Sequence, residues 1–514
     1  MGKKKDLHEI KKLPSRTEHF TDWLNDLLLR TELIDYRYNL KGCGVWRGYG
    51  YKLRRYTLQI IRDLLESTDI PHEEHLFPLL VPDKQFMKEA EHVKGFEEEV
   101  YWVTHGGTTP LDVKLALRPT SETVMYPMFS LWIRSHTDLP LKVYQIVNCF
   151  RWEGKNTRPM IRVREITTFK EAHTAHASAE DAERQIVEAL NVYKTFFEAL
   201  GMSYIVNKRP KWDTFPGADY TIAFDTIFPG RHRALQIGTV HNLGQTFGKT
   251  FDITFETIDK ENDYVYQTCY GISERVIASI IALHGDDKGL VLPMHLAPVQ
   301  IAVIPILFKK ADEEAILDKC REVGQMLKKH GFRVRVDESD QKPGSKFYFW
   351  EMKGVPMRIE IGPRDMKKNQ MVIVRRDNRK KIFVSLDDEE KVIDEINSVA
   401  DDIFDDMRAK VAEDTQSAIL RTKDMDEALE WIEEEKGVAE IPFCGSEDCA
   451  ARIEKRVDGL TFLGTPLRYM DFEEEPAEAL EYGEMNAKSP EDDEAFCVIC
   501  SKRTDEYWTI GRSF

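Results

Sequence analysis

The chain has 514 residues, of which 42% are apolar and 31% charged, and its formal net charge at pH 7 is −17. A chain of this length predicts about three or four domains, and its ordinary composition excludes the disordered and collagen-like classes. The longest apolar stretches, such as residues 299–308, are too short to cross a bilayer, and no apolar segment follows the basic N-terminus as in a signal peptide. We expect a soluble cytoplasmic protein with no membrane contact.

Helical and extended patterns alternate in the N-terminal part of the chain. Apolar residues recur at helical spacing over 49–68 and again over 180–200, which predicts a helix in each segment. Residues 75–82 form a short apolar run that Pro78 and Pro82 interrupt. Such a run is typical of an extended segment at the edge of a sheet.

The middle of the chain is rich in predicted strands. Residues 142–154 and 160–173 are β-rich runs on either side of a polar segment, which predicts an antiparallel hairpin with a long loop. Further strands are predicted at 220–228, 233–244 and 250–256. Strands that follow strands, with helices packed on one side, indicate an antiparallel α+β domain rather than a doubly wound sheet.

The pattern changes near residue 297. A predicted helix is flanked by predicted strands as follows: strand 299–307, helix 312–330, and strands 332–337, 355–362 and 370–376. This β-α-β alternation predicts a separate small α/β domain over 297–401. A charged helical stretch, 402–436, then leads into a cysteine-bearing region, in which 471–495 is interpreted as a solvated acidic surface.

Four of the eight cysteines form two pairs near the C-terminus. Cys444 and Cys449 are spaced C-x4-C, and Cys497 and Cys500 are spaced C-x2-C. Structural Zn²⁺ takes four protein ligands in a tetrahedron, and short pairs supply them two at a time. The gap between the pairs is longer than in a usual zinc ribbon, so four free thiols are the alternative. We predict a structural zinc site.

Three segments come close to known binding motifs without matching them. Residues 42–48 have the glycine pair of a dinucleotide loop, but the third glycine is displaced and no strand precedes them. Residues 244–250 are one residue short of a P-loop. Residues 171–176 lack the HExxH spacing of a metal site, and in a strand their two histidines would face opposite sides. We interpret them as a turn, a strand end and a pocket or core strand.

Basic side chains are concentrated in residues 149–173 of this acidic chain, among them Arg151, Arg162 and Arg164. A solvated β-ribbon is the usual explanation for charge on a strand. Three other polar segments favour a different explanation. They supply Thr120 with Glu122, Gln236 with Thr239 and His241, and Arg275 at the start of an apolar helix over 276–283. Because arginine binds phosphate in bidentate fashion and keeps its charge when desolvated, the set predicts a polyphosphate clamp.

These segments resemble the motifs of class II aminoacyl-tRNA synthetases. The hairpin at 146–173, with FRWE, is similar to motif 2; the segment 269–293, with GISER, to motif 3; and 49–82 to motif 1, the dimer-interface element of that class. Together RPTSE, FKEAH, LQIGTVHNLGQ and KGVPMRIEIGPRD resemble the prolyl-tRNA synthetase family, and the tail from IPFCG to GRSF resembles its archaeal and eukaryotic-type subgroup. The resemblance covers about residues 18–514.

The resemblance implies a division into domains and a homodimer formed through motif 1. The implied domains are a basic extension at 1–17, an α+β antiparallel-sheet catalytic domain at 18–296, an α/β anticodon-binding domain at 297–401 and a zinc-binding α+β domain at 402–514. Bacterial relatives insert an editing domain between motifs 2 and 3. The interval here is too short for one, so we expect no cis-editing activity.

The resemblance also implies ATP-dependent attachment of L-proline to tRNA(Pro) in two steps, through prolyl-adenylate, with release of AMP and diphosphate. In-line attack of the proline carboxylate on the α-phosphorus needs positioning and charge stabilisation more than a protein base. Arg151 and Arg275 are the implied catalytic residues, with Mg²⁺ bound to the ATP phosphates. The implied ATP-binding residues are Arg151, Glu153, Arg162, Gln236, Thr239 and Arg275.

The implied proline pocket offers acceptors for a secondary ammonium and an aromatic wall for the ring. Its residues are Thr120, Glu122, Arg151, Phe169, Glu171, His173, His241, Cys269 and Ser273. The chain departs from the family pattern in two ways. Ile166 stands where the family often has a phenylalanine, so either Ile166 or the Phe169 region packs on adenine. The interval from Arg162 to His173 is one residue longer than in some relatives, which is consistent with a bulge.

In the α/β domain, Glu351, Arg358 and Arg364 match positions that the family uses to read anticodon guanines. Ordinary surface charge is the alternative for Glu351. Two alternatives concern the whole protein: a threonyl or glycyl synthetase, which FKEAH and the cysteine pairs disfavour, and a catalytically idle RNA-binding paralogue. The presence of Arg151 and Arg275 disfavours the paralogue.

Overall fold

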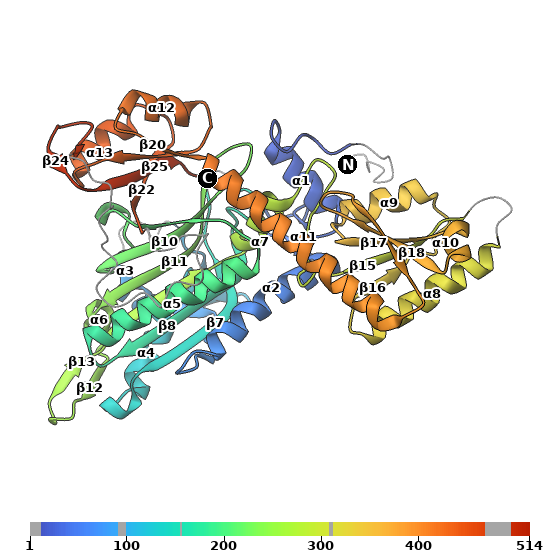
Figure 1. The fold of residues 1–514 in the computed structure, drawn as a ribbon. Helices are drawn as coiled ribbons and strands as arrows, with labels where there is room; N and C mark the ends of the chain where they lie inside the picture. Colours follow the sequence, from blue (N-terminus) through green and yellow to red (C-terminus); the bar gives the residue numbers. More distant parts are fainter. Residues whose placement is uncertain (1–11, 91–98, 155–156, 308–311, 468–494) are drawn as a thin grey trace.

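The structure is a computed structural model that describes residues 12–90, 99–154, 157–307, 312–467 and 495–514. Most of the basic extension, Lys155 of the arginine-rich loop and nearly all of the acidic segment 471–495 lie outside the described residues. The described chain forms a large body around an extended sheet and a smaller α/β body, with one long helix running between them (Figure 1).

The large body is built on a sheet whose central strands are antiparallel, as the strand patterns predict. These strands, in spatial order, are β9 (Ile205–Lys208), β10 (Tyr220–Ile227), β11 (Ala234–Gly244), β14 (Tyr266–Ile272), β8 (Glu165–His176) and β7 (Leu141–Phe150), with the short β3 (Glu73–Glu74) parallel to β7 at the edge. The predicted hairpin is therefore the β7–β8 pair. An extra residue at Thr167–Thr168 in β8 interrupts its register, since Val147 pairs with Phe169 and Cys149 with Ile166.

Helices cover one face of this sheet and leave the other open to a cavity. The covering helices are α1 (Phe20–Arg30), α2 (Gly48–Glu66), α5 (Ala179–Ala199) and α7 (Arg275–His284). The Ser178 hydroxyl caps α5 by accepting a hydrogen bond from the backbone N–H of Asp181 at 3.2 Å. On β8 and β14, the even-numbered Ala172 and Tyr270 pack against the helices. The odd-numbered side chains consequently face the cavity.

One local prediction is wrong. Residues 250–256 form only the short strand β12 (Thr254–Glu256) after helix α6 (Thr246–Thr250), because Asp252 has a left-handed backbone with φ 55° that breaks a strand. Thr120 lies just before helix α4 (Glu122–Trp132), and Glu122 begins that helix.

Smaller elements complete this body. They are β1 (Ile34–Asp35) with β2 (Val45–Trp46), β12 with β13 (Asn262–Tyr264), the sheet β4 (Leu80–Pro82)–β6 (Thr109–Leu117)–β5 (Trp102–Gly106), helix α3 (Asp83–Ala90) and two short 3₁₀ turns at His136–Asp138 and Lys211–Asp213. The β4 strand lies at the edge of its sheet, in agreement with its proline-interrupted sequence.

The α/β body contains a five-stranded sheet in the order β16 (Val334–Val336), β15 (Ile301–Pro305), β17 (Met357–Ile361), β18 (Gln370–Arg375) and β19 (Lys381–Ser385). Helices α8 (Glu313–Lys329) and α11 (Glu389–Ser417) bury their apolar stripes against one face. The sequence patterns missed β19 and the helices α9 (Pro343–Met352) and α10 (Pro363–Lys367). An apolar stripe is nearly absent from α9, which buries only Lys346 and Met352.

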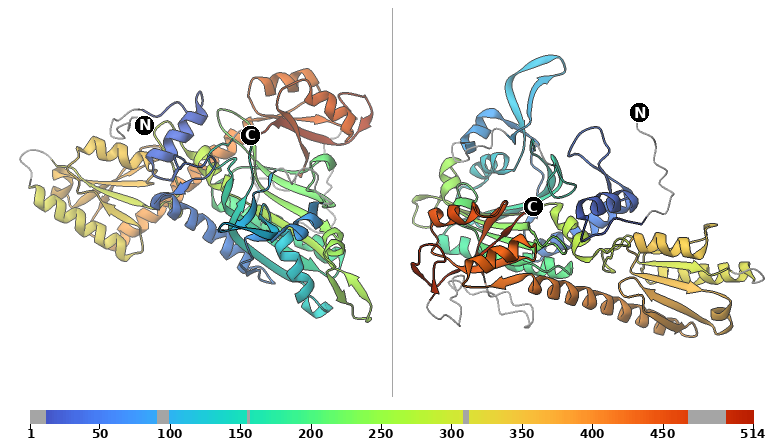
Figure 2. Two further views of the ribbon diagram at one scale, coloured as in Figure 1. Left: turned by 180° about the vertical axis from the view of Figure 1, so that it is seen from behind. Right: turned by 90° about the horizontal axis from the view of Figure 1, so that it is seen from above.

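Helix α11 continues through the predicted boundary at 401–402 and connects the two bodies (Figures 1 and 2). Its residues up to Met407 pack in the α/β core, whereas Val411 packs in the core of the large body. The C-terminal elements that follow are β20 (Ile419–Arg421), α12 (Met425–Glu433), β21 (Val438–Pro442), α13 (Glu447–Glu454), β22 (Leu460–Pro466), β23 (Ala495–Phe496), β24 (Arg503–Thr504) and β25 (Tyr507–Arg512).

The C-terminal strands extend the sheet of the large body. Strand β22 pairs with β9, so that β20, β21, β25 and β22 join the central strands in one 11-stranded sheet. The predicted C-terminal domain is thus attached to the large body by main-chain pairing. Among the described residues, no helix is long and apolar enough to span a membrane.

Candidate active site

The strand register aligns the candidate side chains in rows across the open face of the sheet. One row runs Thr221, His241, Cys269 and His173 across β10, β11, β14 and β8. The next row runs Thr239, Gly271 and Glu171 across β11, β14 and β8. Paired residues of adjacent strands point to the same side. Because Gly271 carries no side chain between Thr239 and Glu171, the middle of this row is hollow.

A cavity of about 410 Å³ lies over these rows. Every ATP-binding and proline-binding candidate from the sequence lines it: Thr120, Glu122, Arg151, Glu153, Arg162, Phe169, Glu171, His173, Gln236, Thr239, His241, Cys269, Ser273 and Arg275. Ile166, the other candidate for the adenine platform, also lines it. These residues come from segments far apart in the sequence, and the sheet register brings them together.

Three arginines converge at one end of the cavity. Arg151 follows β7 and donates from Nε to the Pro119 carbonyl at 3.2 Å, and its guanidinium lies 5.8 Å from the Phe169 ring centroid. Arg275 donates from Nε to the Ile161 carbonyl at 2.9 Å. Burial, and then the positive charge of Arg151, lower the pKa of Arg275 to about 10, with Arg162 contributing in the same direction. A buried concentration of positive charge of this kind favours a polyanion.

The arginine-rich loop does not send all of its cations into the cavity. Arg162, half exposed, donates to Glu153 at 2.5 Å. Arg164 instead stacks 3.9 Å from the Trp152 ring centroid and donates to the Glu153 carbonyl at 3.0 Å, which fixes the loop. Lys170 faces the helices on the opposite side of the sheet, where burial lowers its pKa well below the ordinary value. The charge cluster in the sequence therefore divides into binding and structural cations.

The bulge in β8 is clamped from both sides. Arg54 of α2 donates to the Thr168 hydroxyl at 2.8 Å and to the Thr167 carbonyl at 2.7 Å. The buried Glu274, immediately before Arg275, accepts from the Thr168 backbone N–H at 3.1 Å. Burial raises the pKa of Glu274 to about 7. The clamp joins the predicted motifs 1, 2 and 3 directly behind the Phe169 wall.

Two buried carboxyl groups face the other end of the cavity. Glu171 accepts hydrogen bonds from Ser121 and, at 3.1 Å, from Gln145. Burial raises the pKa of Glu171, but the nearby His173 and the hydrogen bonds from Ser121 and Gln145 outweigh it, and the net shift is downward. Glu122 accepts from Thr120 at 2.5 Å, and burial raises its pKa. The pKa values of the two groups are thus shifted in opposite directions.

The histidines of this end have different partners. His241 lies between the hydroxyls of Thr221 and Thr239, at 2.8 and 3.0 Å, and burial lowers its pKa to about 3, so it is neutral at pH 7. His173 Nδ1 lies 2.9 Å from the Tyr126 hydroxyl, while its buried Nε2 makes no hydrogen bond within the described part of the chain.

Some residues of the site gave no usable signal in the sequence. The loop 212–216 lines the cavity, and its Phe215 ring packs 4.9 Å from the His241 ring, centroid to centroid. Gln145 and Ser121 orient Glu171 from β7 and from the start of α4. A loop with no periodic pattern and a single strand glutamine cannot be distinguished from ordinary surface or core by sequence alone.

In the α/β body, the face of the sheet opposite α8 and α11, which α9 partly covers, carries charge and an aromatic ring. Arg358 donates to Glu351 at 3.1 Å and to Glu360 at 2.9 Å, and stacks 4.0 Å from the Phe347 ring centroid. In register with Arg358 and Glu360 across β18 lie two further side chains, Lys381 and Phe383. Phe383 is 65% exposed, which is unusual for a phenylalanine. The structure brings Glu351 and Arg358 together, whereas Arg364 lies exposed on α10.

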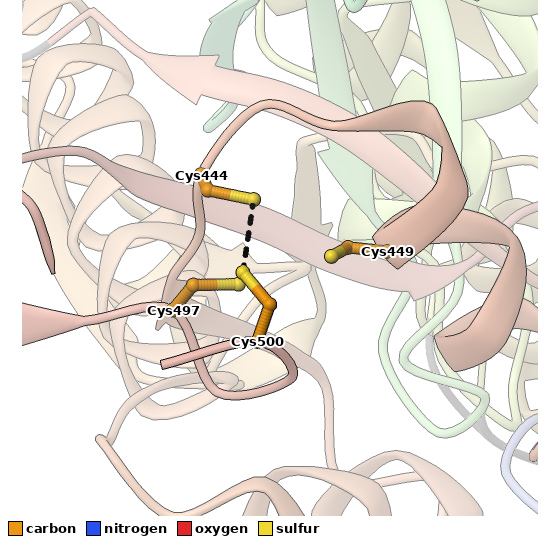
Figure 3. A group of neighbouring side chains, drawn as sticks. All are labelled: Cys444, Cys449, Cys497 and Cys500. Carbon is orange, nitrogen blue, oxygen red and sulfur yellow. Dashed lines mark hydrogen bonds between the residues drawn. The ribbon is translucent and has the colours of Figure 1, made fainter. Parts of the chain in front are cut away.

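The four C-terminal cysteines converge on one point (Figure 3). Their sulfur atoms all lie within 4.8 Å of one another, and the Cys444 and Cys500 sulfurs are 3.7 Å apart. A tetrahedral zinc with Zn–S bonds of about 2.3 Å places its sulfurs about 3.8 Å apart, so this donor set fits Zn²⁺. Cys449 comes from the start of α13, and Cys497 and Cys500 from the turn after β23. The cluster is consistent with a structural zinc site.

Family models match three parts of the chain. The model of the tRNA synthetase class II core domain (G, H, P, S and T) matches residues 101–284, the anticodon binding domain model 300–396, and the prolyl-tRNA synthetase C-terminal model 425–514. None of these three models describes an editing domain.

Relatives match over nearly the whole chain. The proline–tRNA ligase of Methanococcoides burtonii is 49% identical over 98% of both chains, and that of Methanococcus aeolicus is 55% identical over 83% of this chain and 92% of the relative. The solved structure of Giardia lamblia prolyl-tRNA synthetase in complex with prolyl-adenylate superposes with a TM-score of 0.89 at 35% identity, covering 98% of this chain and 100% of that one.

Proposed function

The chain belongs to the prolyl-tRNA synthetase family and acts as a proline–tRNA ligase, and we propose that the cavity beside the β7–β8 hairpin is where it forms prolyl-adenylate. The observation that carries this assignment is the convergence of Arg151, Arg162 and Arg275 at one end of a cavity whose other end holds two buried carboxyl groups. A polyphosphate suits the first end and a proline ammonium the second.

In the first step, the proline carboxylate attacks the α-phosphorus of ATP in line, and the bond to pyrophosphate breaks. Arg151 bridges the carboxylate and the α-phosphate, where negative charge develops in the transition state. Arg162 and Arg275 hold the outer phosphates and the nucleotide. In the second step, a ribose hydroxyl of the terminal adenosine of tRNA attacks the prolyl carbonyl, and AMP leaves.

Proline recognition falls to the far end of the cavity. The secondary ammonium of proline has two N–H donors, and Glu122 with Thr120 offers it a carboxylate and a hydroxyl. Glu171 and His173 close the pocket behind them, with Phe169 as the apolar wall for the ring. Cys269, Ser273 and His241 complete the residues assigned to this pocket.

We assign Mg²⁺ to the ATP phosphates, because this ion binds oxygen donors. Glu153, Gln236 and Thr239 line the cavity and present a carboxylate, an amide oxygen and a hydroxyl. These residues would orient the nucleotide and its metal-bound phosphates. The metal would neutralise charge on the leaving pyrophosphate.

The cysteine cluster holds a structural Zn²⁺. Support comes from the sulfur separations and from the donor set. All four donors are protein thiols, so no coordination position is left for a substrate, as in structural zinc sites. The ion would join the turn after β23, which carries Cys497 and Cys500, to Cys444 before α13 and Cys449 in its first turn.

Anticodon guanines are read at the face of the α/β sheet opposite α8 and α11. Arg358, held flat between Phe347 and two carboxylates, is preorganised to donate to a guanine edge, and Glu351 to accept from a base amine. Arg364 supplies a third contact. The exposed Phe383 ring offers a surface on which an unstacked base can lie.

A homodimer through motif 1 explains an excess of exposed apolar surface around α2. The large side chains exposed in the single chain include Tyr38, Val45, Tyr51, Ile70 and Leu76, the last of them 83% exposed. Clustered exposed apolar residues are typical of subunit interfaces. We place the assembled enzyme in the cytoplasm, with its tRNA substrate.

Editing in cis is not expected. The described residues between Arg151 and Arg275 belong to the catalytic sheet, its covering helix α5 and short connections. We predict that alanyl-tRNA(Pro) is hydrolysed no faster with the purified enzyme than without it. Release of alanine above that rate, in a deacylation assay, would contradict the prediction.

Charging of purified tRNA(Pro) with labelled amino acids tests the proposed function. Proline is expected to be attached, and threonine and glycine are not. Attachment of threonine or glycine would identify a different class II specificity, and no attachment at all would identify a catalytically idle protein.

A further inference from the structure

A second cluster of metal-type donors lies inside the cavity, at the end proposed for proline. A carboxylate oxygen of Glu122, a ring nitrogen of His173 and the sulfur of Cys269 all lie within 4.8 Å of one another. All three residues are buried, at 1 to 4% exposure. Nothing in the proposed reaction assigns these residues to a metal.

The cluster is built by the sheet rather than by a mobile loop. His173 and Cys269 are direct partners in the β8–β14 register, so both side chains leave adjacent strands on the same face. Glu122 reaches the same point from the first turn of α4. Sites on strands and helices hold their ligands in fixed directions, which favours coordination.

The imidazole of His173 has one nitrogen that no other group satisfies. Its Nε2 is buried and makes no hydrogen bond with the described residues, and Glu171 Oε2 is 3.8 Å away, beyond hydrogen-bonding distance. Its Nδ1 lies 2.9 Å from the Tyr126 hydroxyl. When Nδ1–H donates to the Tyr126 oxygen, Nε2 carries a lone pair, which is the arrangement that metal-bound histidines adopt.

We propose that Glu122, His173 and Cys269 form a site for a borderline-soft divalent cation, Zn²⁺ or Co²⁺, that excludes proline from the cavity. One oxygen, one nitrogen and one sulfur ligand suit these ions and not Mg²⁺, which requires oxygen ligands. Three protein ligands leave the fourth position open toward the cavity, where water or a small ligand binds. The exclusion of proline rests on the proposed function, whereas metal binding does not.

Cobalt absorption tests the site without any activity measurement. The zinc-containing protein, free of ATP and chelators, is titrated with Co²⁺, and the near-ultraviolet thiolate-to-cobalt charge-transfer band is followed. We expect a saturable band in the wild-type chain. In the Cys269→Ser variant this band should be lost, because the only thiolate among the three proposed ligands is removed and a hydroxyl is a poor ligand for these ions.

Two further variants control for unrelated thiols and for misfolding. Cys320→Ser alters a buried cysteine of α8 outside the cavity and should leave the band unchanged. His173→Gln should weaken Co²⁺ binding, which is measured as a higher Co²⁺ concentration for half-saturation. The thermal midpoint of each variant is measured to show that the variant is folded. No band in the wild-type chain, or an equal band in Cys269→Ser, overturns the proposal.

Added proline separates this proposal from the assignment of the cavity. If both hold, saturating proline raises the Co²⁺ concentration for half-saturation. A Cys269-dependent band that proline does not affect supports metal binding but overturns the exclusion of proline. Proline binding to a chain that shows no band overturns the metal site alone.

Discussion

Arg151 is the residue on which the proposed chemistry depends most. Its position is fixed by β7 on one side and by the Pro119 carbonyl on the other, so the guanidinium is held rather than mobile. A contact that strengthens as charge develops lowers the activation barrier rather than the ground-state energy.

We predict that Arg151→Ala lowers the single-turnover rate of prolyl-adenylate formation by roughly 100- to 1000-fold, which corresponds to about 3–4 kcal/mol. Arg151→Lys should recover only part of the loss, since an ammonium cannot bind two oxygens in a fixed fork. Arg184→Ala, which removes an exposed arginine of α5, is the matched control. Equal rates for Arg151→Ala and Arg184→Ala would exclude the role given to Arg151.

Four buried histidines should make stability sensitive to acid. Burial lowers the pKa values of His72, His176 and His241 to about 3 and that of His284 to about 4. In the unfolded chain a histidine titrates near pH 6.5, so below that pH the unfolded state binds protons that the folded state does not. The contribution of these histidines to the free energy of unfolding is therefore fully present above pH 6.5 and is lost as the pH falls toward their folded-state pKa values. Glu274, with its pKa raised to about 7, acts in the opposite direction.

We predict that the free energy of unfolding falls between pH 7 and pH 5, and that the thermal midpoint falls with it. Each buried histidine contributes a slope of about 1.4 kcal/mol per pH unit once the pH is well below the pKa of the unfolded chain. His176→Gln should reduce this dependence, whereas His105→Gln, at an exposed histidine, should not. The same dependence in both variants would argue against buried neutral histidines as its cause.

Much of the candidate site could be predicted at this scale because strand alternation decides which residues share a face. Glu171 and His173 alternate with Lys170 and Ala172, and the register then adds Cys269 from another strand. Sequence could not reveal that Lys170 points to the helices until the face was fixed. It also could not place the loop 212–216, whose conformation depends on contacts with distant strands.

At the scale of elements, the bulge in β8 connects helix α2 to the reacting end of the cavity. Arg54 holds the bulge through the Thr167 carbonyl and the Thr168 hydroxyl, and Glu274 holds its backbone N–H. The bulge sets the direction of the Phe169 ring, against which Arg151 lies. Because α2 belongs to motif 1, through which we propose that the chain dimerises, the clamp would couple the proposed dimer interface to the geometry of the cavity.

We predict that Arg54→Ala lowers the rate of adenylate formation by roughly tenfold or more, because hydrogen bonds from a charged donor contribute about 1.5–3 kcal/mol. Arg54→Lys should restore part of the activity by keeping one donor. Arg55→Ala changes the neighbouring, exposed arginine of the same helix and should have little effect. If Arg55→Ala and Arg54→Ala are equally impaired, the loss reflects the helix and not the clamp.

Element prediction succeeded where periodicity was strong and failed where local geometry decided. The helix over 180–200 has five apolar residues in register, and α5 spans Ala179–Ala199. The strand expected over 250–256 is interrupted by the left-handed backbone at Asp252. Helix α9 has no apolar stripe for a pattern to detect.

At the scale of the molecule, the C-terminal region is part of the catalytic sheet. Besides the pairing of β22 with β9, Arg209 donates to the Leu463 carbonyl at 2.8 Å and to Asp225 at 2.8 Å. Arg209 also lines the cavity. Such pairing between strands far apart in the sequence leaves no local signal, so the continuous sheet could not be predicted. Nor did the sequence predict that α11 continues as one helix through the boundary expected at 401–402.

We predict that Cys500→Ser, or removal of the metal with a chelator, lowers the thermal midpoint by several degrees, and that Cys500→Ser lowers the zinc content by one ion per chain. The reason is that metal binding contributes folding free energy where the turn after β23 meets the segment that carries Cys444 and Cys449. Cys320→Ser, at a buried cysteine of α8, should keep its zinc. A wild-type chain without zinc, or a Cys500→Ser chain that retains it, would contradict the assignment.

Proline-dependent exchange of pyrophosphate into ATP, measured without tRNA, tests the central claim most directly because it isolates the step assigned to the cavity. We predict exchange with proline, none with threonine or glycine, and a loss of roughly 100-fold or more in Arg151→Ala and in Arg275→Ala. Exchange that is independent of proline, or that survives both substitutions, would contradict the account.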